Sequence, residues 1–434
     1  MLSSVRKEPP TSPCYSLSLL LTSPTPETLM GKIILSSMPK VIIIGGGIAG
    51  CSVAVELALR GASVTLVERN QPGVGATGAS AGILAPQYEA DASGAAFHFG
   101  VACKEAYPAF VERLQKLAAW EVGFRTDGML VANHSKEEEE ASRRELLLQE
   151  AAGLEGEILS SSDARRIHEA VSMSVHSWLW LPREAQVDSQ RLAVALADAV
   201  QSAGVRLVRG TRVTALVTEG SRVTGVRLED GVEIGAPWVV MAAGAWSGEI
   251  AAIPTYLPVR PVRGQILRLL PPRPLPWTLV CSHQGRYLVP RVNGTVLVGS
   301  TMEEVGYDDR VTEEGTETLA GAAAALLPIL EDATIVEAWA GLRPISPDGW
   351  PILGPDPELD GLLYATGHGR NGILFAPLTA RAVAHLILDG ETNVAWEAFR
   401  IDRFTDEKRR AGPEPTLSPL PPRSSPRTKS EETS

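Results

Sequence analysis

The sequence has 434 residues, 44% of them hydrophobic, with a mean hydropathy of +0.03 and a formal net charge of −11. This length and apolar content suffice for a large core and suggest more than one structural unit. An acidic chain without a segregated basic patch is a poor nucleic-acid binder, and no apolar run reaches the ~20 residues that span a bilayer. The four cysteines, at positions 14, 51, 103 and 281, form no CxxC pair. They signal neither a zinc site nor a disulfide framework, and they favour a reducing, cytoplasmic setting.

Both ends of the chain are rich in Pro and Ser. Residues 1–38 are expected to be a disordered or non-native extension. The alternative is a targeting segment, because Arg6 and Lys7 precede a short apolar patch. Residues 404–434 are expected to form a disordered tail.

The first ordered elements form a βαβ unit. Residues 41–44, Val-Ile-Ile-Ile, predict a buried parallel strand. A helix follows and ends near Gly61, and residues 63–68 predict the second strand. The three elements span about 30 residues, the length of a βαβ unit.

A dinucleotide fingerprint lies within this unit. Gly45, Gly47 and Gly50 form a GxGxxG motif between strand and helix, and Glu68 ends the next strand. Such glycines let the backbone approach a pyrophosphate at the helix N-terminus, and the acid accepts hydrogen bonds from ribose hydroxyls.

Three more runs of small residues favour FAD over NAD, because both ends of the chain would then touch one long cofactor. They are residues 73–84, which include Thr77 and Ser80, residues 242–247, and residues 365–374, which precede a helix. A helix N-terminus at the last run would stabilise negative charge on a reduced flavin ring.

The α/β segments alternate with different material. Charged helices and short strands occupy about 109–183, and antiparallel strands are predicted between 258 and 300. We therefore expect an α/β (overall α+β) fold, in which a Rossmann-like FAD-binding domain is interleaved with a substrate domain built on an antiparallel sheet. The expected FAD-binding domain comprises 39–87, 185–255 and 333–403, and the substrate-binding domain 88–184 and 256–332.

Residues 38 to about 403 resemble the glycine oxidases of thiamine biosynthesis, in the D-amino-acid oxidase family of FAD-dependent oxidoreductases. The segments that carry the resemblance are VIIIGGGIAG, SAGILAPQYEA, YLVPR, VGSTM, WAGLRPISPDGWPILG and GHGRNGILFAPLTA. It implies oxidative deamination of glycine, and of sarcosine or small D-amino acids, by hydride transfer from Cα to flavin N5. The products would be an imino acid or glyoxylate, ammonia and hydrogen peroxide, with iminoacetate supplied to the thiazole of thiamine. Dioxygen would be the oxidant, and the chain would form a homo-oligomer, a tetramer.

The resemblance also assigns site residues. Arg343 matches the arginine that binds the substrate carboxylate, Tyr287 a tyrosine facing that group, and Arg370 a further arginine lining the site. The expected cofactor contacts combine the glycine turns with positions added by the resemblance: Gly45, Gly47, Ile48, Ala49, Gly50, Glu68, Arg69, Ala76, Thr77, Ala81, Gly82, Ile83, Val213, Gly244, His368, Gly369, Arg370, Asn371, Gly372, Ile373 and Leu374.

Each assignment has a structural alternative. Arg343 could form an ion pair with Asp348 or Glu337, Tyr287 could belong to the core, and Arg370 could hold only its loop. His368 could be a buried, hydrogen-bonded histidine without a chemical role. No metal cluster or Ser/His/Asp arrangement stands out.

Some positions depart from the relatives. Related sarcosine oxidases link FAD to a cysteine at the position of Gly341, so we expect non-covalent FAD. Gly285 and Gly369 stand where a related glycine oxidase has a histidine and an aromatic residue, and this difference predicts a roomier pocket. Alternatives for function are a D-amino-acid dehydrogenase, a sarcosine oxidase-like enzyme, and a flavin-binding protein without turnover.

Overall fold

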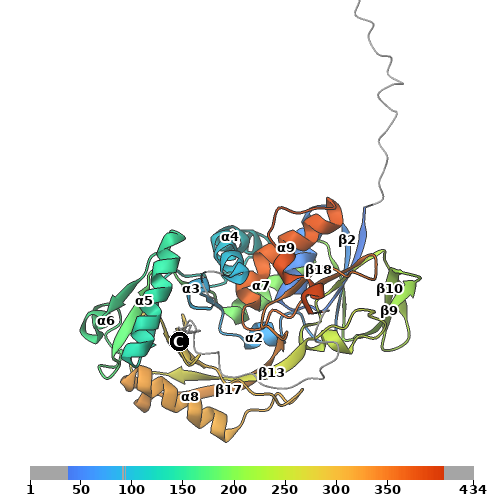
Figure 1. Ribbon diagram of the computed structural model, residues 1–434. Helices are drawn as coiled ribbons and strands as arrows, with labels where there is room; N and C mark the ends of the chain where they lie inside the picture. Colours follow the sequence, from blue (N-terminus) through green and yellow to red (C-terminus); the bar gives the residue numbers. More distant parts are fainter. Residues whose placement is uncertain (1–37, 90–91, 93, 405–434) are drawn as a thin grey trace, which may run out of the picture. The chain divides into compact units, whose positions relative to one another are not determined.

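The computed structural model describes residues 38–89, 92 and 94–404 (Figure 1). The expectations for residues 1–37 and 405–434 lie outside this part of the chain. Within the described ranges, no helix is both long and apolar enough to cross a membrane.

The predicted βαβ unit is confirmed and forms the centre of a six-stranded sheet. Its strand order is β18-β19-β12-β1-β2-β8, parallel throughout except for the β18–β19 pair. β1 is buried on both faces because it is almost wholly apolar. The strands are β1 (Lys40–Ile44), β2 (Ser63–Glu68), β8 (Arg206–Arg209), β12 (Trp238–Met241), β18 (Ile352–Pro355) and β19 (Leu362–Thr366).

Helices cover one face of this sheet. α1 (Ile48–Leu59) contacts α9 (Gly372–Leu388) and α7 (Ser189–Ser202), and α4 (Ala95–Ala118) packs on α7 and α9 (Figure 1). Their apolar side chains share one core with the strands. The strands β9 (Val213–Glu219), β10 (Arg222–Leu228) and β11 (Glu233–Gly235) form a small sheet over a second core, whose members include Ile42 and Met241.

The second large sheet has eight strands in the order β17-β13-β16-β15-β14-β4-β6-β5. It is antiparallel as predicted, except that β14 and β4 run parallel. The strands are β4 (Met129–Asn133), β5 (Glu157–Leu159), β6 (Ser177–Leu181), β13 (Arg260–Leu270), β14 (Leu279–Ser282), β15 (Tyr287–Pro290), β16 (Val296–Gly299) and β17 (Thr334–Ile345).

Three helices accompany this sheet. α5 (Lys136–Ala151) has Ser135 as its N-cap. The Ser135 hydroxyl accepts from the Glu138 N–H, and the Glu138 carboxylate accepts from the His134 N–H. α6 (Ser161–Ile167) contacts β5 and β6, and α8 (Glu313–Leu326) packs on β13 and β16.

Short elements link the two sheets. α2 (Ala76–Ala79) and the 3-10 helix η2 (Gly244–Glu249) follow strands of the six-stranded sheet. β3 (Ile83–Leu84) pairs with β7 (Ala185–Gln186) in a two-stranded sheet, and α3 (Pro86–Glu89) follows β3. The division into two interleaved domains stays a prediction. One strand bears on its boundaries, since β17 falls within 333–403 but pairs with β13 of the eight-stranded sheet.

Candidate functional site

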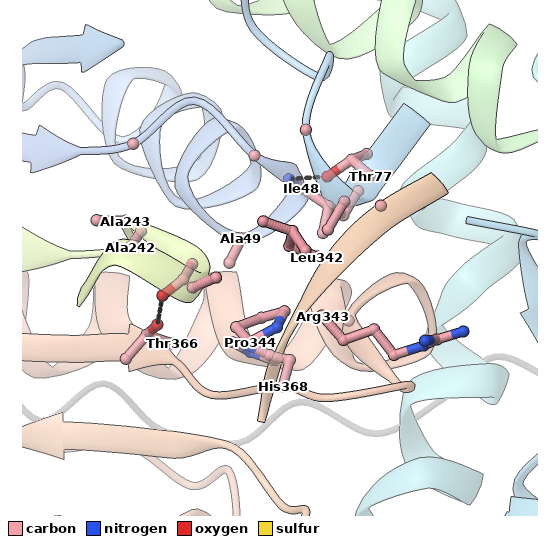
Figure 2. Close-up of a pocket in the computed structure, with 18 of the residues that line it drawn as sticks. Ile48, Ala49, Thr77, Ala242, Ala243, Leu342, Arg343, Pro344, Thr366 and His368 are labelled. Atoms are coloured by element: carbon pink, nitrogen blue, oxygen red, sulfur yellow. Dashed lines mark hydrogen bonds between the residues drawn. The ribbon is translucent and has the colours of Figure 1, made fainter. Parts of the chain in front are cut away.

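A cavity of about 550 Å³ extends from the carboxyl ends of β1, β2, β12 and β19 to β13, β15 and β17 (Figure 2). The carboxyl edge of an open α/β sheet is where ligands of such folds bind. The volume lies within the usual range of small-molecule pockets.

The glycine turn after β1 cannot carry side chains at two positions. Gly45 has φ +102°, and a Cβ there would lie 2.4 Å from the Ala242 carbonyl oxygen. A Cβ on Gly50 would lie 1.9 Å from the Gly45 oxygen. Gly45 and Gly47 line the cavity, whereas Gly50 does not. Gly50 therefore allows α1 to pack closely on the turn. It does not line the cavity, although we predicted that it contacts the cofactor.

Backbone amides are held in place around this turn. The Glu68 carboxylate at the end of β2 accepts from Gly46 N at 2.6 Å and Asn70 N at 2.8 Å. The Ile48 N–H donates to Thr77 Oγ1 at 2.9 Å, which joins the start of α1 to α2 (Figure 2). Glu68, Ile48 and Thr77 all line the cavity.

An aromatic group borders the same end of the cavity. The Arg69 guanidinium lies 3.4 Å above the Trp246 ring, and Trp246 stacks on Tyr307. Such a cation–π contact holds the arginine over an apolar surface. Trp246 was not among the predicted site residues, although it belongs to the small-residue run 242–247 that the sequence singled out.

Arg343 extends from β17 over the neighbouring strand β13. A Cβ on Gly264 of β13 would lie 2.0 Å from Arg343 Nη1, so the guanidinium occupies space that only glycine leaves open. Nη2 donates to Ser300 Oγ at 2.6 Å, and Nη1 donates to the Thr301 carbonyl at 3.2 Å. These acceptors are uncharged and orient the fork toward the cavity that Arg343 lines.

The ion-pair alternative for Arg343 is wrong. Asp348 pairs with Arg403 at 2.8 Å, and Glu337 pairs with Arg268 at 3.0 Å. Desolvation lowers the pKa of Arg343, and the neighbouring Tyr287 partly opposes that effect. Because free arginine titrates so far above neutrality, the group stays charged at neutral pH.

Tyr287 lies beside Arg343 in the same wall. It begins β15 and is nearly buried, and its ring crosses Gly299 of β16. A Cβ on Gly299 would lie 2.3 Å from the Tyr287 hydroxyl oxygen. Two glycines on adjacent strands therefore make room for the two residues that the resemblance assigned to the substrate.

Arg370, in the loop between β19 and α9, forms an ion pair that sequence reasoning missed. Its Nη2 lies 3.1 Å from Glu89 Oε1, with side chains 22% and 12% exposed, and both residues line the cavity. The Glu89 carboxylate raises the pKa of Arg370. A signal for Glu89 existed, because it is an acid at the end of the otherwise uncharged run SAGILAPQYE.

His368 lines the cavity and is hydrogen-bonded inside the protein. Its Nε2 lies 3.1 Å from Thr379 Oγ1, and burial lowers its pKa to about 4. The imidazole is therefore neutral at physiological pH. Its buried environment agrees with the structural alternative, and its position in the cavity wall agrees with cofactor contact.

The backbone conformation explains why glycine stands at positions 285 and 369, where the relatives have side chains. Gly285 and Gly369 have φ +76° and +56°, a region in which side chains are unfavourable. A Cβ on Gly369 would also lie 2.9 Å from the Gly349 oxygen. Gly285 leaves space beside Arg370, since a Cβ there would lie 3.8 Å from Nη1.

The cavity brings together all but three of the predicted site residues. Besides Gly50, the exceptions are Asn371 and Leu374, which are 7% and 1% exposed and face the protein interior. They lie at the start of α9, three positions apart, so both are on the helical face that is turned away from the cavity. Residues that line it without having been predicted include Glu89, Trp246, Gly264 and Ser300.

The residues present fit an FAD molecule. The wall joins the glycine turn at the N-terminus of α1, the Glu68 carboxylate and the turns after β12 and β19. Together they offer a pyrophosphate site, a ribose acceptor and a stretch of cavity wall made of small residues. Figure 2 shows Ala49, Leu342 and His368 among the residues that line this cavity.

Comparisons with known proteins agree with this assignment. A family model described as FAD dependent oxidoreductase matches residues 40–386. The chain is 36% identical to the bifunctional protein ThiO/ThiG of Nostoc sp. over 84% of its length, and it spans about half (55%) of that relative. It is 37% identical to a glycine oxidase of Pseudomonas aeruginosa, covering 80% of this chain and 94% of the relative. The crystal structure of glycine oxidase from Geobacillus kaustophilus superposes with a TM-score of 0.81 at 32% identity, covering 84% of this chain and 99% of that one. The chain therefore belongs to the FAD-dependent oxidoreductase family.

Proposed function

We propose that this protein oxidises glycine to an imino acid that hydrolyses to glyoxylate and ammonia, and that sarcosine and small D-amino acids are further substrates. The proposal rests on the position and contacts of Arg343. Its guanidinium is fixed by two uncharged oxygen atoms and faces a cavity that also contains a dinucleotide fingerprint.

The protein's contribution is binding and orientation. The Arg343 fork would hold the substrate carboxylate through two parallel hydrogen bonds, and the Tyr287 hydroxyl beside it would donate a third. A carboxylate fixed in this way aims the Cα–H bond of the amino acid along the cavity, and such positioning accelerates reactions by itself. When bound, FAD supplies the two-electron oxidation and passes the electrons to dioxygen, which becomes hydrogen peroxide.

The cofactor is proposed to be non-covalent. Gly341 replaces the cysteine that related sarcosine oxidases use, and a Cβ there would lie 2.6 Å from the Ala79 Cβ. Of the cysteines that the structure describes, Cys51, Cys103 and Cys281, none lines the cavity. Denaturation should release the yellow colour from the polypeptide, and colour that stays on the chain would refute this part.

The wider setting belongs to the same proposal. The names of the relatives and the resemblance of the sequence support a role in supplying iminoacetate for the thiazole of thiamine. The buried free cysteines agree with a reducing, cytoplasmic setting. A homo-oligomer, in the form of a tetramer, follows from the resemblance alone, and sedimentation of the purified protein would test it.

The first experiment measures peroxide release in air from glycine, sarcosine, D-alanine and D-proline. We expect peroxide with glycine, and its loss in an Arg343→Leu variant that still carries flavin. Flavin reduction without peroxide would instead identify a dehydrogenase. A flavin that none of these substrates reduces would refute the proposal and indicate a binding protein without turnover.

A further inference from the structure

Three charged residues surround the substrate end of the cavity. Arg343 and Arg370 are cations, and Glu89 is an anion that lines the same wall. The net charge of this group is therefore +1. An amino acid with one carboxylate would use one of the two arginines, so the role of the second needs an explanation.

Arg370 already has an acidic partner from a distant part of the chain. Glu89 ends α3, whereas Arg370 follows β19, and their side chains meet at 3.1 Å with little exposure to solvent. At such burial, the attraction between opposite charges is much stronger than at a surface. The pair therefore fixes the charge of Arg370 before any substrate enters.

The two residues before Glu89 are anchored by buried hydrogen bonds. The Tyr88 hydroxyl donates to the Ser282 carbonyl at 2.7 Å. The Gln87 side chain donates to Gln149 Oε1 at 3.0 Å, and its backbone N–H donates to Glu184 Oε1 at 3.2 Å. Glu89 is thus held in position by buried contacts of its neighbours, and it does not need the substrate to order it.

We propose that Glu89 determines substrate specificity by neutralising Arg370, so that the cavity keeps one uncompensated cation, Arg343, and rejects amino acids that carry a second carboxylate. The proposal rests on the proposed function, because it assumes that an amino-acid carboxylate binds Arg343. Rejection by an unfavourable charge is a common source of specificity.

Space does not account for the rejection. Gly285 has no side chain and leaves room beside Arg370 Nη1, with its hypothetical Cβ at 3.8 Å. A second carboxylate could therefore approach Arg370, but it would also meet the Glu89 anion. Like charges at close range in a binding site oppose binding, and Glu89 is the group that repels the second carboxylate.

The test compares substrates that differ by one carboxylate. Sarcosine and iminodiacetate share the N–CH2–carboxylate unit, and D-alanine and D-aspartate form a second pair. In the wild type we expect kcat/KM to favour the monocarboxylate of each pair. In Glu89→Gln the ratio of dicarboxylate to monocarboxylate should rise by about tenfold or more, which corresponds to about 1.4 kcal/mol.

Two further variants isolate the charge. Arg370→Gln leaves Glu89 uncompensated, so the same ratio should fall below that of the wild type. The double variant Glu89→Gln/Arg370→Gln should return it toward the wild-type value. Glu56→Gln is the matched control, because it breaks a half-buried ion pair with Arg113 (2.7 Å) away from the cavity. It should leave the ratio unchanged.

Binding without turnover separates this proposal from the proposed function. Acetate and malonate are titrated into the flavin-loaded protein, and the flavin spectrum reports their dissociation constants. A selective gain for malonate in Glu89→Gln supports the proposal even if glycine is not oxidised. An unchanged malonate-to-acetate ratio in folded, flavin-loaded Glu89→Gln would overturn it, as would a rise of the ratio in Arg370→Gln.

Discussion

The two ends of the cavity are built by different means. The end at β1 and β2 consists mostly of backbone and small residues, where Gly45 leaves space for the Ala242 carbonyl and amides are held by Glu68 and Thr77. The end at β13, β15 and β17 consists of large charged or polar side chains, Arg343 and Tyr287, which lie over glycines. The first end depends on the close approach of backbone segments to one another, and the second end depends on the charged and polar groups of its side chains.

This difference teaches where each kind of substitution should act. Changes at the glycine-turn end should alter cofactor retention and leave the substrate carboxylate site intact. Changes at the eight-stranded sheet should alter substrate binding while the protein keeps its flavin. Of the four predictions that follow, those for Arg343, Glu68 and Gly264 test this separation, and the one for His368 concerns the stability of the cavity wall.

The largest effect is expected for Arg343→Leu. Removing one partner of a buried charge interaction costs about 2–5 kcal/mol, so kcat/KM for glycine should fall by about 30-fold to several thousandfold. Flavin content should equal that of the wild type. Arg403→Leu is the control, since Arg403 pairs with Asp348 outside the cavity. A loss below tenfold, or loss of the flavin, would contradict the assignment.

A pH effect should follow from His368, which lines the cavity in the loop between β19 and α9. Burial lowers its pKa to about 4, below the ordinary value of 6.5. Between these values the unfolded chain binds more protons than the folded one, so stability falls as the pH drops from 6.5 toward 4. Below pH 4 the free energy of unfolding should be lower by roughly 3 kcal/mol than above pH 6.5 because of this one histidine.

The measurement is the free energy of unfolding of wild type and His368→Gln at several pH values. The wild type should lose more stability on acidification, by at most about 1.4 kcal/mol per pH unit. His168 is also buried, with a pKa lowered to about 4, but it is present in both proteins and cancels in the difference. Parallel pH profiles would show that His368 does not titrate in this way.

Glu68→Gln should weaken cofactor retention. The carboxylate accepts from Gly46 and Asn70 amides, and hydrogen bonds to charged groups are worth about 1.5–3 kcal/mol. We expect the flavin dissociation constant to rise by about tenfold to a hundredfold. At saturating FAD, KM for glycine should stay unchanged. A change in KM at full flavin loading would show that the two ends are not separable.

Gly264→Ala should disturb Arg343 alone. The added Cβ would lie 2.0 Å from Nη1, so the guanidinium must move. Overpacking costs about 1–3 kcal/mol, and we expect KM for glycine to rise by about fivefold to a hundredfold, with flavin content unaffected. Gly321→Ala in α8 is the matched control, because nothing lies within 4 Å of its Cβ. An unaltered KM in Gly264→Ala would refute the clearance argument.

Local patterns allowed much of the six-stranded sheet to be predicted. The apolar run of β1, the glycine turn and the acid that ends β2 lie within about thirty residues, so a local sequence pattern was enough to predict them. The roles of Arg343 and Tyr287 were predicted from the family resemblance, because the residues next to them in the sequence do not indicate which anion they bind. The start of α9 was predicted as a continuous contact, although Asn371 and Leu374 turn inward.

The sequence by itself determined the βαβ unit, the fingerprint and the family, because each depends on residues close together in the chain or on their order. Only the tertiary structure decided which charges face one another. Glu89 and Arg370 are separated by 281 positions, and Gly264 matters only because β17 pairs with β13 and places Arg343 over it. Such contacts arise from strand register and from the packing of one sheet against another, which a local pattern does not record.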